Sequence, residues 1–456
     1  MGYMPVTDSM FLLAESREHP MHVGGLQLFT PPEGAGPEFI TDVLDTVRSQ
    51  TNVSARFRRR PADPVNLLGT TWWTEDDNID FDYHVRHSAV PRPGRIRELF
   101  QLTSRWHSAL LDRHRPLWEM HVVEGLQDGR FATYTKVHHS IVDGVSALRL
   151  LQNSLSTDPD NTACTAPWSP TLRRGKPSVD TRISLGRLIP EVLDTVGSLA
   201  GLLPAGVKIA NQAFRDNNLI TPLDAPDTLL NQPIGGSRRF VAQSWEIERV
   251  RQISRKSGAT INDVVLAMCA GALRTYLQEQ DALPAKSLTT AVPVSLRSND
   301  KLDDDGNSIG LIIATLATDV DDPAERLAAI RASVLAAKGV MSELSPLQIL
   351  AMSAVNGAPM ALTPLPGFVS HTRPPFNVLI SNVPGPKEQM YWNGARLDGI
   401  YPASVPMDGL ALNITLTSNY DKLDFGLTGC RQTLPSLQRM IHHLEDALLD
   451  LEKSFS

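Results

Sequence analysis

A pair of histidines is followed by a carboxylate in the segment HHSIVDG, which occupies residues 138–144. The side chains that can do chemistry there are those of His138, His139 and Asp143, and Gly144 closes the segment. An imidazole with an ordinary pKa of about 6.5 can take a proton from a hydroxyl or thiol near neutral pH and pass it to a leaving group. We therefore predict a catalytic motif for proton transfer that is made of these four residues.

The motif lies where a strand is expected to turn into a helix. Residues 131–137, FATYTKV, are rich in the aromatic, β-branched and Thr residues that are typical of strands. Residues 145–155 repeat their apolar side chains every three or four positions, as a helix does. Because neighbouring side chains of a strand point to opposite faces, His138 and His139 cannot both face one small reacting centre. We expect one of them to act and the other to pack, while Gly144 gives the turn its backbone freedom.

Two other interpretations of the motif stay open at this point. Two His and one Asp are suitable ligands for a metal ion, which would make the protein a metal-dependent hydrolase. The opposite faces of the His pair, and a sequence without HExxH or CxxC spacing, do not favour that site. The second alternative is a His pair that is hydrogen-bonded in a core and purely structural.

HHxxxDG resembles the signature of the wax ester synthase/diacylglycerol acyltransferase family, within the larger group of CoA-dependent acyltransferases that share HxxxD. More of the chain resembles the same family, in its usual block order and in both halves. The blocks are DSMFLLAESREHPMHVGGLQLF (residues 8–29), RPLWEMHVVEGL (115–126), INDVVLAMCAGALRTYL (261–277), AVPVSLR (291–297) and LISNVPGP (379–386). HxxxD alone is short, so the ordered set carries the resemblance, which looks closest to the actinobacterial triacylglycerol synthases.

The resemblance implies a fold and a division of roles. The fold is a mixed α/β architecture of two similar subdomains with the active-site channel between them. His139 is implied to be the catalytic base, and Asp143 a structural carboxylate that pairs with an Arg, for which Arg297 is the candidate. A buried carboxylate needs such a partner, and an interior ion pair that loses one member costs roughly 3 to 5 kcal/mol. The alternative for Arg297 is a solvated surface charge.

Three further side chains are candidates for support of an oxyanion. Asn262 opens an apolar helical run, where it is either a plain helix cap or a donor near the acyl carbonyl. Ser381 and Asn382 follow the apolar strand pattern NVLI. They mark either the exit of a strand into a turn or donors that the strand brings to the reaction centre.

The reaction that the resemblance implies is transfer of a long-chain acyl group from acyl-CoA to diacylglycerol, and also to long-chain alcohols. The sequence has no GxSxG elbow and no Cys beside a His, so we predict direct transfer without a covalent acyl-enzyme. Acyl-CoA is expected as a co-substrate, and no cofactor is expected. A noncatalytic lipid carrier, and a condensation enzyme that takes its acyl group from a carrier protein, are the alternatives from other classes.

Composition and charge narrow the class of protein. The chain has 456 residues, 42% of them hydrophobic, which is enough for two or three domain-sized cores. A net charge of -7 with dispersed basic residues argues against nucleic acid as a partner. Cys164, Cys269 and Cys430 form no metal pattern and indicate a reducing, cytoplasmic compartment. From the first residues we expect neither a signal peptide nor a membrane-spanning helix.

Breaks in the pattern of expected strands and helices predict that the chain has three parts. Residues 1–157 form an N-terminal subdomain with the HHSIVDG motif, 158–235 a linker with crossing helices, and 236–456 a C-terminal subdomain. The apolar segment 183–210 is a candidate for peripheral contact with a membrane or lipid droplet, or else a helix packed on its own protein. The segment 345–368 is expected either to wall a tunnel for acyl chains or to fill a core.

Two other motifs are assigned no catalytic role. ARFRRR, residues 55–60, concentrates positive charge that could meet CoA phosphates or anionic lipid headgroups, although we favour a solvated turn. YDKLDFGLTG, residues 420–429, contains Asp424, Phe425 and Gly426, which resemble part of a loop in plant members of the wider group. The rest of that loop's pattern is missing, so we predict a strand.

Overall fold

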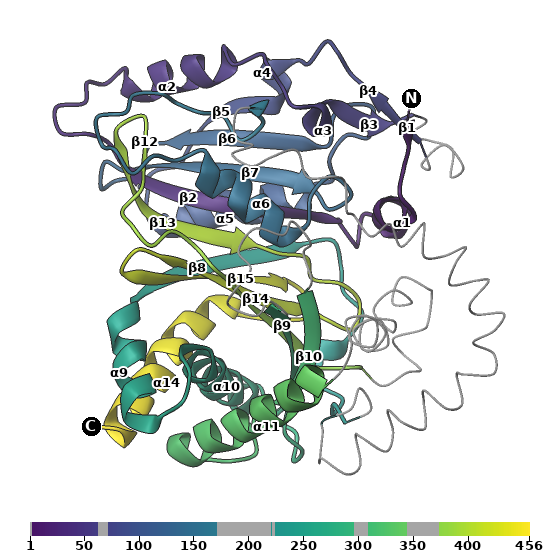
Figure 1. The fold of residues 1–456 in the computed structure, drawn as a ribbon, viewed down its shortest axis with the longest axis vertical. Coiled ribbons are helices and arrows are strands. Elements are labelled where there is room, and N and C mark those ends of the chain that lie inside the picture. The colour runs from purple at the N-terminus through teal and green to yellow at the C-terminus, as the bar shows by residue number, and fades with distance from the viewer. Residues whose placement is uncertain (1, 63–71, 171–219, 221–223, 296–308, 344–373) are drawn as a thin grey trace.

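The computed structural model describes residues 2–62, 72–170, 220, 224–295, 309–343 and 374–456. Arg297 and the segments 183–210 and 345–368 lie outside these ranges. Two six-stranded mixed sheets form the framework, one in each half of the molecule (Figure 1). The predicted α/β fold with two subdomains is confirmed.

The first sheet carries the HHSIVDG motif. In spatial order its strands are β12 (Tyr391–Trp392), β13 (Ala395–Ala403), β2 (His22–Thr30), β7 (Phe131–His138), β6 (Trp118–Glu124) and β5 (Val85–Ala89). β7 is buried along its whole length and pairs antiparallel with both β2 and β6. Its aromatic and β-branched side chains fit such a position, since they pack well on a pleated surface. The strand predicted for residues 131–137 is confirmed.

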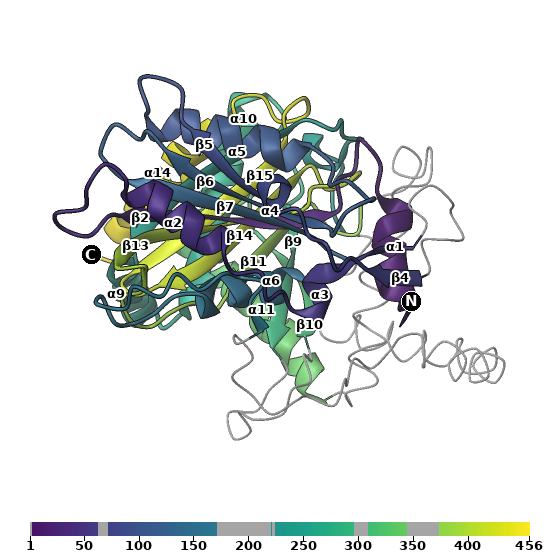
Figure 2. The ribbon, with the colours of Figure 1, turned by 90° about the horizontal axis from the view of Figure 1, so that it is seen from above.

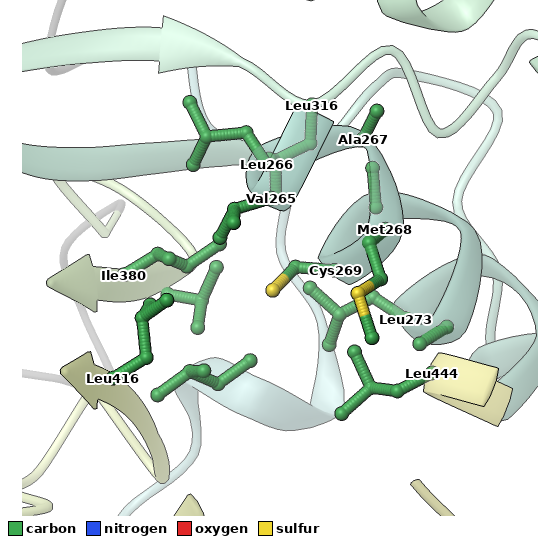
Figure 3. Close-up of a cluster of buried hydrophobic side chains, with 14 of the residues drawn as sticks. Val265, Leu266, Ala267, Met268, Cys269, Leu273, Leu316, Ile380, Leu416 and Leu444 are labelled. Carbon is green, nitrogen blue, oxygen red and sulfur yellow. The ribbon is translucent and has the colours of Figure 1, made fainter. Parts of the chain in front are cut away.

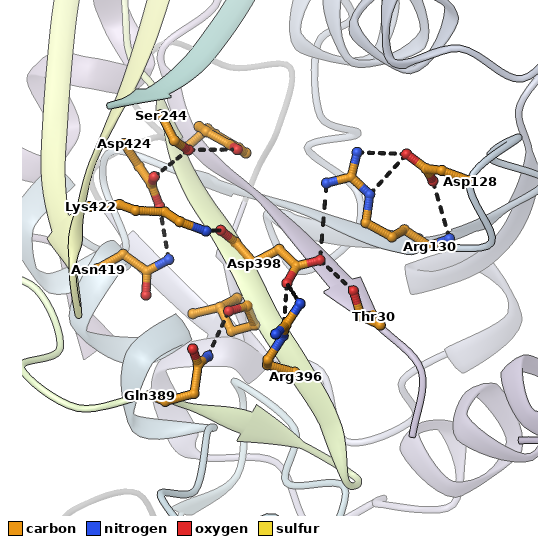
Figure 4. A network of polar contacts seen from close by, with 12 residues as sticks. Thr30, Asp128, Arg130, Ser244, Gln389, Arg396, Asp398, Asn419, Lys422 and Asp424 are labelled. Atoms are coloured by element: carbon orange, nitrogen blue, oxygen red, sulfur yellow. Dashed lines mark hydrogen bonds and ion pairs between the residues drawn. The ribbon is translucent and has the colours of Figure 1, made fainter. Parts of the chain in front are cut away.

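Strand β13 belongs to the first sheet although it comes from the C-terminal part of the chain. It pairs antiparallel with β2 from Arg396↔Thr30 to Ala403↔Gly24, with a bulge at Asp398. The Asp398 carboxylate accepts hydrogen bonds from Thr30 Oγ1 at 2.5 Å and from Arg396 Nε at 3.1 Å (Figure 4). The three-part division of the chain stays a prediction, but membership of the sheets does not follow it at β12 and β13.

The second sheet is covered by helices that lie together on one face (Figure 1). Its strands, in spatial order, are β10 (Ile309–Thr315), β9 (Thr289–Ser295), β11 (Val378–Val383), β14 (Leu412–Asn419), β15 (Lys422–Cys430) and β8 (Arg238–Glu246). The helices are α9 (Ile247–Ser257), α10 (Ile261–Glu279), α11 (Pro323–Glu343) and α14 (Met440–Ser454). The strand predicted for the YDKLDFGLTG motif is confirmed as β15.

Helix α10 is the centre of the larger hydrophobic core. Its side chains are buried on all sides from Asp263 to Ala272, as expected for a helix that is apolar all round. Leu266 and Cys269 of this helix lie among side chains from β11, β14 and α14 (Figure 3). A Cβ on Gly271 would lie 2.8 Å from the Cβ of Ala447, so the glycine allows α10 and α14 to approach closely.

The remaining elements flank the first sheet. They are β1 (Gly2–Tyr3), α1 (Val6–Ala14), α2 (Phe39–Arg48), α3 (Ala55–Arg58), β3 (Arg59–Pro61), β4 (Trp72–Glu75), α4 (Phe81–His84), α5 (Ile96–Ser108) and α6 (Gly144–Asn153), with 3-10 turns η3 (Leu229–Asn231) and η4 (Leu437–Arg439) in the other half. Helix α1 and the small sheet β1-β4-β3 lie at one end of the molecule (Figure 2). None of the helices in the described ranges combines the length and apolarity needed to cross a bilayer.

A buried carboxylate connects the two sheets. Asp424 of β15 is fully buried and accepts hydrogen bonds from Ser244 Oγ at 2.5 Å and from Asn419 Nδ2 at 3.0 Å (Figure 4). It also accepts one from the backbone N–H of Ile400 at 2.7 Å. Ile400 lies on β13 in the first sheet, whereas the other three residues belong to the second. Burial raises the pKa of Asp424 to about 7, although these hydrogen bonds oppose the rise.

Changing Asp424 to Asn is expected to remove a pH dependence of stability. The folded chain binds a proton at Asp424 below about pH 7, whereas the unfolded carboxyl with its ordinary pKa of about 3.9 does not. The stability of the native protein relative to Asp424→Asn should therefore fall as the pH rises, by roughly 2 to 3 kcal/mol between pH 5 and pH 8. The free energy of unfolding in urea, measured at both pH values, gives this change. Asp421→Asn, at an exposed position, is the control. A difference in stability between native protein and Asp424→Asn that stays the same at both pH values would contradict the prediction.

Candidate active site

The HHSIVDG motif begins at the last residue of β7 and ends at the first residue of α6. The backbone N–H of His138 donates to Leu117 O at 3.0 Å, and that of His139 donates to Met21 O at 2.9 Å. Ile141 and Val142 of the turn are buried and anchor it in the core of the first sheet. The predicted transition from strand to helix is confirmed, and the motif lies beside the start of β2.

His139 is half-buried and stacks on an aromatic ring of α1. Its ring centroid lies 4.3 Å from that of Phe11, with 14° between the planes. Its Nδ1 has no hydrogen-bond partner among the described residues. Burial lowers the pKa of His139 to about 4, and the nearby Asp143 charge partly offsets this. The imidazole is therefore neutral at physiological pH and able to accept a proton.

His138 occupies a fully buried site on the other side of the strand end. Its Nδ1 accepts a hydrogen bond from the Ser140 N–H at 3.1 Å and lies 2.6 Å from Ser140 Oγ. Since Nδ1 is an acceptor, a neutral ring carries its proton on Nε2, which lies 3.3 Å from Glu15 Oε1. The expectation that one His packs and the other stays available agrees with this difference in burial. The catalytic assignments themselves remain proposals.

Asp143 differs from the buried carboxylate that we expected. It is exposed and is the N-cap of α6, where its two oxygens accept from the Ser146 N–H at 2.8 Å and from Ser146 Oγ at 2.9 Å. The expectation of burial is wrong, because a carboxylate that caps a helix at the surface is solvated and needs no ion-pair partner. Arg297, the proposed partner, lies outside the described residues, so that pairing stays a prediction.

Gly144 does not need the conformational freedom that we expected of it. It is the first helical residue of α6, and its φ is not in the left-handed region that favours glycine. A Cβ there would meet Val23 Cγ1 at 3.9 Å, an ordinary contact. The argument from backbone freedom is therefore wrong, since the helix starts with an Asp cap and not with a left-handed turn.

The oxyanion candidates lie on two elements of the second subdomain. Asn262 is half-buried in the first turn of α10, but the helix cap is Thr260, which forms a capping box with Asp263. The interpretation of Asn262 as the cap is therefore wrong. Ser381 and Asn382 are half-buried on β11, opposite residues of the parallel strand β14, so they lie in the strand itself and not at its exit. Their role near the reaction centre stays a prediction.

Two arginines of the basic ARFRRR motif, Arg58 and Arg60, lie near carboxylates of the following segment. The motif forms α3 and β3 instead of the turn that we favoured. Arg58 pairs with Glu75 at 2.8 Å and with Asp77 at 3.4 Å, and Arg60 Nε lies 3.9 Å from Asp76. Carboxylates therefore occupy the guanidinium of Arg58, which weakens the case that this motif binds the phosphates of CoA.

Sequence reasoning missed the buried carboxylate of Glu15, which lies just after α1. Its side chain is 1% exposed and contacts His138, Met21 and Arg113. The signal that could have found it was the resemblance of residues 8–29 to a family block, since that segment has no other obvious function. Elsewhere, the described part of the chain contains no group of three His, Cys, Asp or Glu side chains that could hold a metal ion.

The two-sheet architecture, with a His motif at the end of a central strand, defines the class of HxxxD acyltransferase-like folds. The first condensation domain of the calcium-dependent antibiotic synthetase has the same fold, with a TM-score of 0.61 at 14% identity, over 99% of this chain and 95% of that one. Two family models match the chain, "Wax ester synthase/diacylglycerol acyltransferase catalytic domain" over residues 4–265 and "WS/DGAT C-terminal domain" over 305–452. The chain belongs to the wax ester synthase/diacylglycerol acyltransferase family, as its motifs predicted.

Relatives in this family match the chain over nearly its full length. A probable diacylglycerol O-acyltransferase of Mycobacterium tuberculosis is 51% identical over 100% of this chain and 99% of its own. An O-acyltransferase of Acinetobacter baylyi is 42% identical over 97% of this chain and 95% of its own. The wax ester synthase/diacylglycerol acyltransferase of Marinobacter aquaeolei, a solved structure, has a TM-score of 0.79 at 43% identity, over 100% of this chain and 99% of that one. These matches identify the chain as an acyltransferase and give no support to a metal-dependent hydrolase.

The low pKa of His139 predicts the acid limb of the activity profile. A general base must be unprotonated, and the pKa of about 4 keeps it so throughout the neutral range. We expect kcat/KM to stay level from neutral pH down to about pH 5 and to fall below that, with its midpoint near the His139 pKa. Initial rates with radiolabelled acyl-CoA measure this profile. A midpoint near 6.5 would contradict it.

Proposed function

We propose that this protein transfers a long-chain acyl group from acyl-CoA to the hydroxyl of diacylglycerol, and also to long-chain alcohols, with His139 as the general base. The observation that carries the proposal is the neutral, half-buried imidazole of His139 at the end of β7. The names of the relatives support the reaction type, since they are called diacylglycerol O-acyltransferase or wax ester synthase.

The ring that stacks on this imidazole belongs to an apolar cluster with side chains from both halves of the chain. Phe11, which stacks on His139, belongs to a cluster with Met21, Val23 and Ala147 of the first half. Val405 and Met407, which come from the segment after β13, complete it. An apolar wall of this kind suits the acyl or alkyl chain of a lipid better than it suits a polar acceptor.

The chemistry needs one base and a donor for the oxyanion. The acceptor O–H bond breaks as its oxygen attacks the thioester carbonyl, and the proton passes to His139. The tetrahedral oxyanion is held by donors, for which Asn262, Ser381 and Asn382 are the candidates. The C–S bond then breaks, and the imidazolium returns the proton to the CoA thiolate, so that His139 ends neutral. Asp143 caps the start of α6, whose first residue is Gly144, just after the base.

Lipid products and free thiol together test the function. Purified protein is incubated with labelled palmitoyl-CoA and either diacylglycerol or hexadecanol, with and without a chelator. We expect labelled triacylglycerol or wax ester, one free thiol per ester formed, and no effect of the chelator. Bound lipid without release of thiol would indicate a carrier, and release of thiol without ester would indicate a hydrolase. Activity only with an acyl carrier protein would indicate a condensation enzyme.

We also propose that the protein, which we expect in the cytoplasm, reaches its lipid acceptor by peripheral contact with a membrane or lipid droplet. Support comes from exposed apolar side chains near α1, namely Met10 (47% exposed) and Leu13 (46%), with Tyr3 and Trp72 on the adjoining small sheet. Such side chains can insert at the headgroup boundary of a bilayer. The double variant Met10→Glu/Leu13→Glu should float less with liposomes than native protein, and equal flotation would contradict this.

A further inference from the structure

The carboxylate of Glu15 is held at the centre of the contacts behind the His pair. It follows the last residue of α1, and its side chain is 1% exposed. Oε2 accepts from Arg113 Nε at 3.2 Å and from Arg113 Nη2 at 3.0 Å, and the same Nη2 donates to Leu12 O at 2.7 Å. Arg113 therefore fixes both the carboxylate and the end of the helix that carries it.

The other oxygen of Glu15 faces the two elements that hold the histidines. Oε1 lies 3.3 Å from His138 Nε2 and accepts from the Met21 N–H at 3.2 Å. Met21 O in turn accepts the backbone N–H of His139 at 2.9 Å. One oxygen therefore contacts His138 directly and is linked to the backbone of His139 through a single residue, Met21.

Helix α1 adds a contact with the ring of His139. Phe11 lies one turn before Glu15 and stacks on the imidazole at 4.3 Å between ring centroids. The position of Phe11 depends on how the end of α1 is anchored, and Glu15 with Arg113 provides that anchor. The carboxylate is thus linked to the base both through the backbone of Met21 and through the helix that carries the stacking ring.

The segment between α1 and β2 is also bound by the C-terminal half. His19 Nε2 lies 3.0 Å from Asp408 Oδ2, and the buried Arg238 donates from Nη2 to Glu18 O at 2.7 Å. These contacts tie residues 15–21 to the second subdomain, so the segment bridges the two subdomains at the site. Glu15 is the first residue of this segment, and its side chain contacts His138.

We propose that Glu15 is a positioning residue for the base His139, acting through Met21, His138 and the Phe11 stack. This inference rests on the proposed function of His139. It predicts that loss of the carboxylate misplaces the base without altering the affinity for acyl-CoA, since no described contact of Glu15 reaches beyond these protein groups. A misplacement of about 1 Å can lower a rate by about 100-fold.

The test compares Glu15→Ala and Glu15→Gln with Glu18→Ala, a control in the same segment whose side chain is exposed. We expect Glu15→Ala to lower kcat by about 10- to 100-fold with little change in KM for palmitoyl-CoA. Glu15→Gln should recover part of the loss, because its amide oxygen can still accept the Met21 N–H. Glu18→Ala should behave as the native protein does.

Two further measurements separate positioning from a general loss of folded protein. A more acidic acceptor, 2,2-difluorohexadecan-1-ol, depends less on a general base than hexadecanol does, so the deficit of Glu15→Ala should be smaller with it. Modification of His139 by diethylpyrocarbonate, read by peptide mass spectrometry, should become several-fold faster in Glu15→Ala. This second measurement does not require that the protein transfer acyl groups.

The outcomes distinguish the inference from the function on which it rests. Native rates of modification and turnover in Glu15→Ala would overturn the inference. An equal deficit with both alcohols, together with a lower melting temperature, would assign Glu15 a purely structural role and overturn it as well. Native protein without any transferase activity would refute the proposed function, and a faster modification of His139 would still support the positioning by Glu15.

Discussion

Replacing His139 with Ala is expected to lower kcat by roughly 100- to 10,000-fold, the usual loss when a general base is removed. The neutral imidazole is half-buried at the end of β7, and no other described imidazole of the motif is available, since His138 is fully buried against Ser140 and Glu15. Ester formation from labelled palmitoyl-CoA and hexadecanol measures the loss. Because His139 is not fully buried, the variant should fold.

The matched control for this variant is His114→Ala. The His114 side chain is 68% exposed, and its contact is a surface pair with Asp112. It should keep native activity, and both variants should keep the native far-ultraviolet circular dichroism. Turnover near the native value in a folded His139→Ala protein would remove the proposed mechanism.

Replacing Lys136 with Met is expected to destabilise the protein by roughly 3 to 5 kcal/mol, because it breaks a buried ion pair. The Lys136 ammonium is fully buried, lies 2.8 Å from Glu119 Oε1, and donates to Trp106 O and Ala109 O at 2.8 Å each. Those carbonyls end helix α5, where a cation is favourable. Met would remove this donor from both carbonyls and from Glu119 Oε1, although Arg86 Nη2 would remain 3.3 Å from Glu119 Oε2. The free energy of unfolding in urea measures the effect.

Lys256→Met provides the control for the loss of a lysine. Lys256 is exposed on α9, so the same substitution there should change the stability by no more than about 0.5 kcal/mol. The pKa of Glu119 shows how strongly the buried site favours charge, since Lys136 and His121 lower it to about 2 although burial raises it. If both variants unfolded at the same urea concentration, the buried pair would contribute nothing to stability.

Local patterns predicted the parts of the site that depend on near neighbours. Strand alternation separated His138 from His139, and apolar spacing predicted the helix after Gly144. The caps could also have been predicted, since Asp143 precedes Ser146 by three residues and Thr260 precedes Asp263 by three, which is the spacing of N-caps and capping boxes. The expectation that Asp143 is buried came from the family resemblance, and this local spacing could have corrected it.

Contacts between distant parts of the chain could not be predicted from one sequence. Glu15 meets His138 across more than a hundred residues, and no local pattern indicates that a carboxylate after α1 should be buried. The pairing of β13 with β2 also joins residues that are far apart in the sequence. It could not be predicted, because strand register depends on tertiary packing and on side chains that the strands meet only after folding. Such partners are visible only when the packing is known.

The place of β13 in the first sheet has a consequence for synthesis on the ribosome. β2 pairs with a strand that emerges only after residue 395, so its outer edge has no partner while most of the chain is still being made. At the usual rates of translation, that delay lasts roughly 20 to 70 s. An unpaired edge of a sheet can pair with other chains and aggregate, so the nascent chain is expected to need a chaperone until β13 has left the ribosome.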